Sequence, residues 1–348
     1  MSKASRIASP RGRLFVNVAL IGFGLILSFG AVELILRTGM LGDTYYQGPV
    51  PEGNTLKPKH KIMILGDSFL TSWGSTGLSD FLIKDLAAED AEVLNTAEAG
   101  NGPVDYLTAM KAYAPSFKPD LVLLFYYAGN DLTAVQYANP WRDWLKKYIK
   151  PCLMKSRLFY FLKEKRKQLF ERRINYDSIQ QAGVSKDAIL SAQKREINPW
   201  LLDLTRERKN FIHDNILMET PDNMRAWSEI QGLLKEIHRA SAKMNAQFMI
   251  VMIPHTVQVS RSHFDFYQKL QFNMDDRALV SDKPQALLNA FCERNQIPCL
   301  DLLPHLRAES QKELYRDKDD HFNRAGAELS SQRVLDFLTK NTSLTQSS

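Results

Sequence analysis

The longest apolar run in the chain lies near its N-terminus, at residues 14–36. These 23 residues contain one amide, Asn17, and one carboxylate, Glu33. About 20 apolar residues cross the hydrocarbon core of a bilayer, so the run is long enough to span one. It has no polar stripe at helical spacing, unlike a helix packed on a core. We therefore predict a transmembrane segment, with Glu33 either reaching the lipid interface or pairing with another membrane helix.

The charges before this run predict the orientation of the chain. No acidic residue precedes it, but four basic residues do: Lys3, Arg6, Arg11 and Arg13. By the positive-inside rule, residues 1–13 form a cytoplasmic tail and everything after the run is exported. A cleaved signal peptide is the alternative, but its apolar region usually has about 7–15 residues and ends at a small-residue cleavage site. We expect an uncleaved signal anchor, a single pass of the cell inner membrane, and a periplasmic domain.

Beyond a linker at residues 37–60 that contains several Gly and Pro, short apolar runs alternate with segments of helical periodicity. The runs predict strands at residues 62–65, 93–94, 121–127, 248–254 and 297–303. Helices are predicted at residues 78–88, 104–114, 286–294 and 324–338. Strands separated by helices imply a parallel sheet with helices on both faces. Such sheets bind ligands at the carboxyl ends of their strands, so reactive residues are expected directly after the strands.

The net charge of +6 arises in two segments. The tail carries four positive charges, and residues 142–173 contain twelve Lys or Arg against three Asp or Glu. The rest of the chain is therefore acidic overall, and the basic composition is no argument for a nucleic-acid partner. Three cysteines without a Cys-x-x-Cys pair give neither a disulfide scaffold nor a zinc pattern. Cys292 and Cys299 flank a helix-to-strand turn, and both a disulfide and free thiols are compatible with that position.

A serine follows the first predicted strand, in the sequence Gly66-Asp67-Ser68. A strand-to-helix turn exposes a serine hydroxyl, and the N-terminus of the following helix stabilises negative charge that develops there. The tripeptide also suits a simple helix cap, so it is weak evidence when taken alone.

Further polar residues follow the next two strands and precede the last helix. Gly100 lies beyond the second strand, where glycine lets backbone N–H groups approach a ligand closely. Asn130 lies beyond the third strand, where its amide could donate to an oxyanion. His321 follows several acids shortly before the last helix. Ordinary turns and surface loops use the same residue types, so each of these residues also has a structural explanation.

Taken in order, these residues resemble the SGNH/GDSL hydrolases. Four blocks carry the resemblance: Gly66-Asp67-Ser68, Gly100 in a context that begins at Asn95, Gly129-Asn130-Asp131, and His321 followed by Phe322, Asn323 and Gly326. It covers roughly residues 61–131 and 245–340. The resemblance implies a flavodoxin-like three-layer α/β fold and a serine hydrolase that needs no metal or other cofactor. It implies Ser68 as nucleophile, His321 as base, and an oxyanion hole from the backbone N–H groups of Ser68 and Gly100 and the Asn130 side chain.

The chain departs from the commonest pattern of the family at one position. Many members have an Asp three residues before the histidine, but Lys318 stands there in this chain. The resemblance to membrane-anchored members, which have Asp-x-His, favours Asp319 as the acid, and Asp320 and Asp317 are the alternatives. The acid would hold the tautomer of the imidazole and stabilise the imidazolium. Asp67 and Asp131 are expected to cap or orient loops.

Residues 132–245 show no strong strand pattern and predict a helical insertion. Its basic part interleaves cations with apolar residues, which suits contact with anionic headgroups, an acidic polysaccharide or a membrane protein partner, or an ordinary solvated helix. Sugar stacking or interfacial anchoring is expected for its aromatic side chains Trp141, Trp144, Tyr148 and Tyr160.

The predicted organisation is a tail at residues 1–13, an anchor at 14–36, a linker at 37–60, a hydrolase domain at 61–340 and a short tail at 341–348. The leading functional hypothesis is an anchored serine esterase or O-acyltransferase that acts on acyl esters, most simply acetyl esters, of cell-envelope glycans. A lipid or thioester hydrolase at the membrane surface is one alternative. A catalytically inactive subunit or scaffold of a membrane complex is the other.

Overall fold

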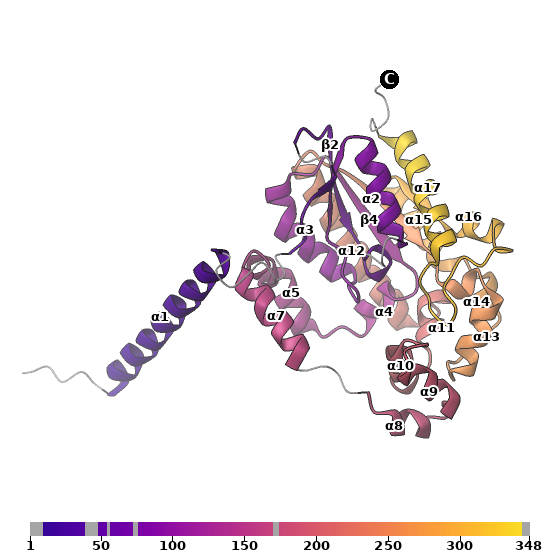
Figure 1. The fold of residues 1–348 in the computed structure, drawn as a ribbon, viewed down its shortest axis with the longest axis horizontal. Helices are drawn as coiled ribbons and strands as arrows, with labels where there is room; N and C mark the ends of the chain where they lie inside the picture. Colours follow the sequence, from indigo (N-terminus) through magenta and orange to yellow (C-terminus); the bar gives the residue numbers. More distant parts are fainter. Residues whose placement is uncertain (1–9, 39–47, 54–55, 72–75, 170–173, 343–348) are drawn as a thin grey trace, which may run out of the picture. The chain divides into compact units, whose positions relative to one another are not determined.

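The computed structural model describes residues 10–38, 48–53, 56–71, 76–169 and 174–342. The predicted tail before residue 10, the linker residues 39–47, Phe170 and the C-terminal tail from residue 343 lie outside the described residues. The chain forms two compact units. One comprises Met1–Gly48 with Cys152–Glu171, and the other comprises Pro49–Pro151 with Arg172–Ser348 (Figure 1).

The smaller unit contains helices α1 (Pro10–Arg37) and α7 (Arg157–Leu169). The part of α1 from Val16 to Arg37 is long and apolar enough to cross a membrane, by length and composition. A signal sequence at the start of a chain would meet the same criterion.

Glu33 of α1 caps the N-terminus of α7. Its carboxylate accepts hydrogen bonds from the backbone N–H groups of Arg157 (3.1 Å) and Leu158 (2.8 Å) and from the Ser156 hydroxyl (2.7 Å). The first N–H groups of a helix have no partner within it, and the helix dipole favours a negative charge beside them. The sequence left open whether Glu33 reaches the lipid interface or pairs with another membrane helix, and the structure places its carboxylate at the start of a second helix of the same chain.

The larger unit is built on a six-stranded sheet with the order β1-β3-β2-β4-β5-β6. The strands are β1 (Glu52–Gly53), β2 (His60–Leu65), β3 (Ala91–Asn95), β4 (Leu121–Tyr127), β5 (Gln247–Ile253) and β6 (Cys299–Asp301). Strands β2 to β6 are parallel, and β1 pairs antiparallel with β3 at the edge. Both β1 and the start of β2 fall within the segment predicted as a linker, because a two-residue edge strand has no hydrophobic pattern of its own to reveal it.

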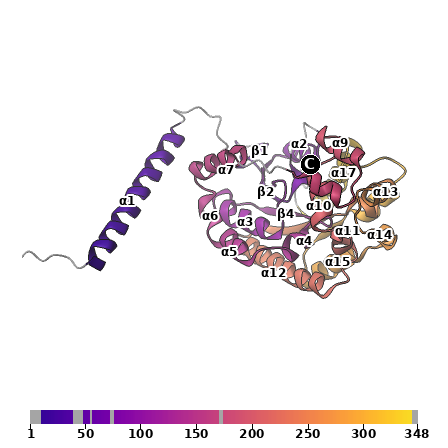
Figure 2. The ribbon, with the colours of Figure 1, turned by 90° about the horizontal axis from the view of Figure 1, so that it is seen from below.

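Alternate residues of strands β2 to β5 point to opposite faces of the sheet, and both faces are buried there. Met63 and Leu65 of β2 belong to one apolar cluster, whereas Ile62 and Ile64 belong to the other. The first face is covered by helices α3 (Pro103–Phe117), α12 (Pro221–Lys243) and α15 (Lys283–Asn295). The second is covered by α2 (Leu78–Ala88), α16 (Leu303–Ala308) and α17 (Arg324–Asn341), as Figure 2 shows in part. The predicted three-layer α/β fold with a parallel sheet is confirmed.

Helix α12 belongs to this core, although its residues lie within the predicted insertion. Its side chains Trp227, Ile230 and Leu234 are buried in the same cluster as β4 and β5. It connects β4 to the parallel strand β5, a connection that needs a crossover element. The insertion proper is therefore shorter than residues 132–245, because α12 is part of the core.

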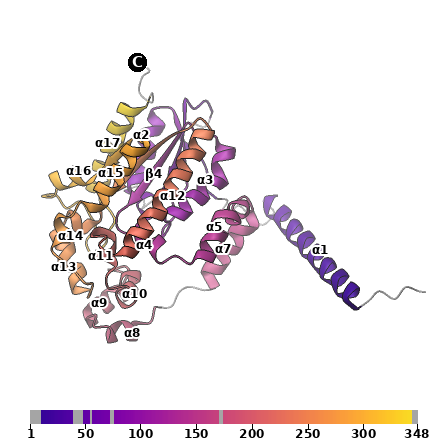
Figure 3. The same ribbon diagram turned by 180° about the vertical axis from the view of Figure 1, so that it is seen from behind.

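Four other helices of the segment form a separate cluster (Figure 3). Residues of α8 (Tyr176–Gln181), α9 (Lys186–Gln193), α10 (Pro199–Glu207) and α11 (Phe211–Ile216) share an apolar core with α13 (Arg261–Lys269) and α14 (Arg277–Val280). Two further helices, α4 (Asp131–Gln136) and α5 (Pro140–Tyr148), follow β4 directly, and the short α6 (Lys150–Leu153) comes after them. The insertion is thus helical, as predicted, and part of it packs on residues that follow β5.

The cysteines are free thiols. Cys292 is buried, Cys299 is partly exposed and Cys152 is exposed. Of the two states that the sequence left open for Cys292 and Cys299, the structure has the reduced one.

Gly326 provides a test of the packing around the last helix. A Cβ at this position would overlap the backbone carbonyl of Leu314, which cannot move aside like a flexible side chain. We expect Gly326→Ala to lower the free energy of unfolding by about 1–3 kcal/mol, as overpacking does. Gly232 in α12 is the matched control, because a Cβ there has open space around it. Gly232→Ala should raise stability by about 0.5–1 kcal/mol. Equal unfolding midpoints for both variants in urea would contradict this account.

Candidate active site

The carboxyl ends of the parallel strands bring the predicted site residues together. Ser68 begins the short helix η1 (Ser68–Leu70) after β2, and Asn130 follows β4. Gly100 follows β3, and His321 lies in the loop before α17. All four line one cavity of about 470 Å³. Strands β2 and β4 are neighbours at the point where the strand order reverses, which is where open α/β sheets bind ligands.

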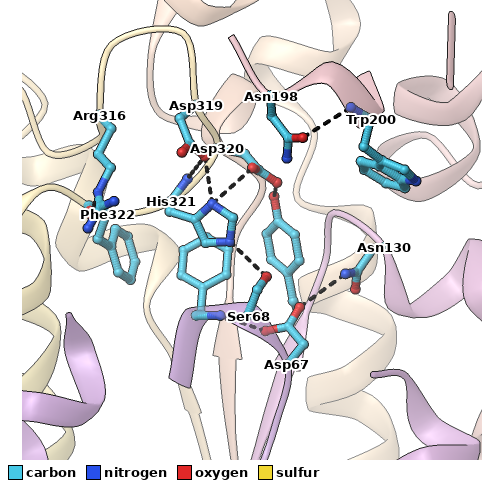
Figure 4. Close-up of polar contacts among 12 residues, drawn as sticks. Asp67, Ser68, Asn130, Asn198, Trp200, Arg316, Asp319, Asp320, His321 and Phe322 are labelled. Carbon is cyan, nitrogen blue, oxygen red and sulfur yellow. Dashed lines mark hydrogen bonds and ion pairs between the residues drawn. The ribbon is translucent and has the colours of Figure 1, made fainter. Parts of the chain in front are cut away.

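Ser68, His321 and Asp319 form a continuous hydrogen-bonded chain (Figure 4). The Ser68 hydroxyl lies 2.7 Å from Nε2 of His321, and Nδ1 of His321 lies 2.6 Å from a carboxylate oxygen of Asp319. The same oxygen of Asp319 accepts a hydrogen bond from the backbone N–H of His321 at 3.1 Å. The imidazole is therefore held from the far side of the ring, with its other nitrogen directed at the serine.

Two carboxylates determine the charge of this imidazole. Asp320 lies 3.3 Å from Nδ1 of His321, and its second oxygen accepts a hydrogen bond from the Tyr127 hydroxyl at 2.9 Å. Burial alone would lower the pKa of His321, but the charge of Asp320 and the hydrogen bond to Asp319 outweigh it and raise this pKa to about 9. Burial acts to raise the pKa of Asp319, yet its hydrogen bonds to His321 lower it to about 2. Of the candidate acids Asp317, Asp319 and Asp320, Asp319 makes the shortest contact with Nδ1 of His321, at 2.6 Å against 3.3 Å for Asp320.

Asp67 connects the loop after β2 to the loop after β4. It is fully buried, accepts a hydrogen bond from the backbone N–H of Phe69 at 3.1 Å, and accepts another from the Asn130 side chain at 3.0 Å. Burial raises the pKa of Asp67 to about 6. The contact orients the Asn130 amide with its nitrogen towards Asp67, and an amide nitrogen carries a second N–H that can serve a ligand.

Asp131 helps to fix the loop after β4. Its carboxylate accepts hydrogen bonds from the Tyr106 hydroxyl and from the backbone N–H of Tyr127, both at 2.9 Å. Asp67 and Asp131 each accept one hydrogen bond from a backbone N–H and one from a side chain. These contacts agree with the prediction that the two residues orient loops.

Gly100 adopts a backbone conformation that other residues avoid. Its φ is +80°, in the left-handed region, although a Cβ there would meet nothing within 4 Å. The glycine is therefore needed for its backbone conformation and not for space. It places this turn at the edge of the cavity beside Ser68.

Four further residues that the sequence did not point to also line the cavity. His255 follows β5 and is buried, and burial lowers its pKa to about 3, so it is neutral. Its position directly after a strand is the signal that would have pointed to it. Trp200, Arg208 and Phe211 come from the insertion, and no local pattern marks them as part of the site.

Asp319, Asp320 and His321 are also the one group among the described residues whose ligand atoms lie close enough to hold a metal ion, all within 4.8 Å of one another. The same atoms already bond to each other, to Ser68 and to Tyr127. An ion there would have to replace these contacts, so the residues fit a proton-transfer chain better than a metal site.

A family model matches the C-terminal part of the chain. Residues 211–348, which include Asp319 and His321, match the family described as "SGNH hydrolase-like domain, acetyltransferase AlgX". The resemblance predicted from the sequence is thereby confirmed, and the match supports the general class of ester hydrolases and acyltransferases. A comparison with curated protein sequences finds no match.

Solved structures match at low identity. An acetyl xylan esterase, AlAXEase, has 13% identity and a TM-score of 0.43, with 79% of this chain and 98% of that chain covered. Axe2, an acetylxylan esterase from Geobacillus stearothermophilus, has 12% identity and a TM-score of 0.42, with 81% and 95% covered. A lipase/acylhydrolase from Enterococcus faecalis has 14% identity and a TM-score of 0.40, with 83% and 100% covered. At these values the likeness gives no information about the substrate of this chain.

The charge of the imidazole can be measured directly. In an NMR titration we expect the His321 ring to lose its proton near pH 9, well above an ordinary histidine. Asp320→Asn should lower this pKa, because it removes the charge that contributes most to raising it. His263→Gln, outside the Ser68–His321–Asp319 chain, identifies one of the other histidine signals. A pKa of His321 near 6.5 that Asp320→Asn leaves unchanged would refute the electrostatic account.

Proposed function

We propose that the chain is a serine esterase or O-acyltransferase that works through an acyl-serine intermediate. The observation that carries this proposal is the unbroken contact from Ser68 through His321 to Asp319, at 2.7 and 2.6 Å. A nucleophile, a base and a group that orients the base are the three parts that acyl transfer needs within hydrogen-bond reach. An inactive scaffold has no need for this alignment.

In the proposed mechanism, the Ser68 hydroxyl attacks the ester carbonyl while Nε2 of His321 takes its proton. Asp319 keeps the ring in the tautomer that accepts this proton and stabilises the imidazolium that results. The negative charge on the carbonyl oxygen is met by the backbone N–H groups of Ser68 and Gly100 and by the Asn130 amide. One such donor typically contributes about 10²–10³ in rate.

The tetrahedral intermediate then collapses and the bond to the alcohol breaks. His321 returns its proton to the leaving oxygen, and the acyl group remains on Ser68. Water or a sugar hydroxyl completes the cycle by attacking the acyl-serine, with His321 again as the base. Water gives hydrolysis, and a sugar hydroxyl gives transfer of the acyl group.

The proposed substrate is an acetylated cell-envelope glycan. The description of the matched family as that of an acetyltransferase supports acetyl as the acyl group. A second candidate, a lipid or thioester hydrolase, is favoured by the apolar side chains Leu201, Phe211 and Ile212 in the cavity wall. These side chains could accept a longer acyl chain.

We further propose that α1 anchors the protein in the inner membrane and that the larger unit is exported. The apolar stretch Val16–Arg37 and the basic residues before it support this orientation. Helix α7 begins at the end of α1 that would emerge on the exported side, where Glu33 caps it. Its exposed Lys163, Lys165 and Arg166 are then close to anionic headgroups.

Substitutions in the chain of contacts test the catalytic proposal. We expect Ser68→Ala to lower kcat for an aryl acetate by about 10⁶-fold and to abolish labelling by a fluorophosphonate. Asp319→Asn should lower kcat by about 10⁴-fold, because the imidazole would be held in the wrong tautomer. Asp317 lies exposed in the same loop, so Asp317→Asn is the matched control and should keep activity within a few-fold. Full activity of a folded Ser68→Ala variant would refute the proposal.

Cys152 offers a test of the orientation, because it is the exposed cysteine among the three. In spheroplasts that express the full chain, a membrane-impermeant maleimide should label Cys152, and Cys152→Ser should lose the label. In the Cys152→Ser background, Ser2→Cys should be labelled only after the membrane is permeabilised. Labelling of Ser2→Cys in sealed spheroplasts would mean that the orientation is the reverse of the one proposed.

A further inference from the structure

Three hollows in the larger unit lie next to one another and share lining residues. The cavity at Ser68 shares Gly100, Thr133, Ala134 and Arg208 with a second hollow of about 230 Å³. The second hollow shares Val104, Val135 and Asp143 with a third, of about 770 Å³, between α3, α5 and α12. The second hollow thus lies between the cavity at Ser68 and the third hollow, which has no residue of the Ser68–His321–Asp319 chain in its wall and which we call the distal groove.

Aromatic side chains of α5 line the distal groove. Trp144 and Tyr148 both belong to its wall, and they remain 45% and 58% exposed. Their ring centroids lie 5.8 Å apart, and Trp141 stacks on Trp144 at 5.2 Å with an angle of 10° between the planes. Exposed aromatic rings that gather on one surface commonly mark a binding site. The C–H faces of sugar rings pack well against such rings.

The charges of the distal groove favour an uncharged ligand. Its wall carries four carboxylates and two cations: Asp143, Asp222, Glu229, Glu236, Lys147 and Arg225. Two of the carboxylates are already paired, Asp222 with Arg225 at 2.7 Å and Glu236 with Lys111 at 2.8 Å. With Lys111 counted, four carboxylates stand against three cations, so the groove offers no excess of positive charge to hold an acidic polysaccharide or an anionic lipid. Carboxylates are, in contrast, good acceptors for sugar hydroxyl groups.

We propose that the distal groove binds a stretch of an uncharged polysaccharide chain, at a distance from the ester that Ser68 attacks. This inference rests on the proposed function and adds to it that the substrate is a polymer. Contacts far from the reacting bond fix the position of the polysaccharide along the groove, and this places the ester beside Ser68. Trp144 and Tyr148 are specificity residues and take no part in the chemistry.

Kinetics with substrates of different length test the proposal. The probes are partially acetylated xylan, acetylated xylobiose, acetylated polygalacturonate and an aryl acetate. We expect Trp144→Ala to lower the ratio of kcat/KM for acetylated xylan to kcat/KM for the aryl acetate roughly 3- to 10-fold, mainly through KM, because one aromatic contact is lost. Trp144→Phe, which keeps a ring, should restore most of the ratio. Leu190→Ala removes a comparably exposed side chain of α9 outside the groove and should leave the ratio unchanged.

Each outcome bears on the proposal. An unchanged ratio in Trp144→Ala, or an equal fall for xylobiose and for xylan, would overturn it. A loss confined to acetylated polygalacturonate would overturn the assignment to an uncharged chain.

A second measurement keeps this inference separate from the proposed function. Affinity electrophoresis of the Ser68→Ala variant in gels that contain unmodified xylan reports binding without catalysis. Retardation that Trp144→Ala abolishes supports the groove even if the wild-type protein hydrolyses none of the esters, in which case only the proposed function fails. Equal mobility with and without xylan would overturn the groove.

Discussion

The hydrogen bond between Asp319 and Nδ1 of His321 is the interaction on which the proposed chemistry of the site depends. At 2.6 Å it turns the ring so that its other nitrogen meets Ser68 at 2.7 Å. Without it only the longer contact of Asp320 with Nδ1, at 3.3 Å, would hold the tautomer in which Nε2 can accept the serine proton in the proposed mechanism. Asp320 adds charge from the same loop, and the two carboxylates raise the pKa of His321 to about 9, so the ring can take the serine proton only in its neutral form, which gains population as the pH rises towards 9.

Burial of further carboxylates beneath the site keeps the three strand-end loops in place. Asp67 and Asp131 are fully buried, and every charge taken out of water has a cost unless hydrogen bonds compensate it. Here the compensation comes from backbone N–H groups and from the side chains of Asn130 and Tyr106. The loop that carries the proposed nucleophile and the loop that carries the proposed oxyanion donor are thus joined through Asp67. If the two loops separate, this buried carboxylate loses its hydrogen bond from Asn130 and keeps only the one from Phe69.

The helices inserted after β4 give the cavity at the strand ends its particular shape. One part closes the cavity with Trp200, Arg208 and Phe211, and α5 lines the distal groove with its aromatic rings. In the proposed function the core supplies the chemistry, and the insertion selects the substrate. The distinction has a physical reason, because the strand ends are held by the buried sheet, whereas helices added between strands can vary without disturbing it.

The sequence by itself determined the sheet, its order of elements and the four residues that meet at its edge. Apolar runs such as residues 121–127 appear as buried strands because both faces are covered, and parallel strands bring Ser68, Gly100 and Asn130 to one edge. Only the tertiary structure decided which acid meets His321, since three aspartates lie within four residues of it in the chain. It alone also revealed β1, the role of α12 in the core, His255 and the groove. These depend on contacts between distant segments, and no local periodicity records them.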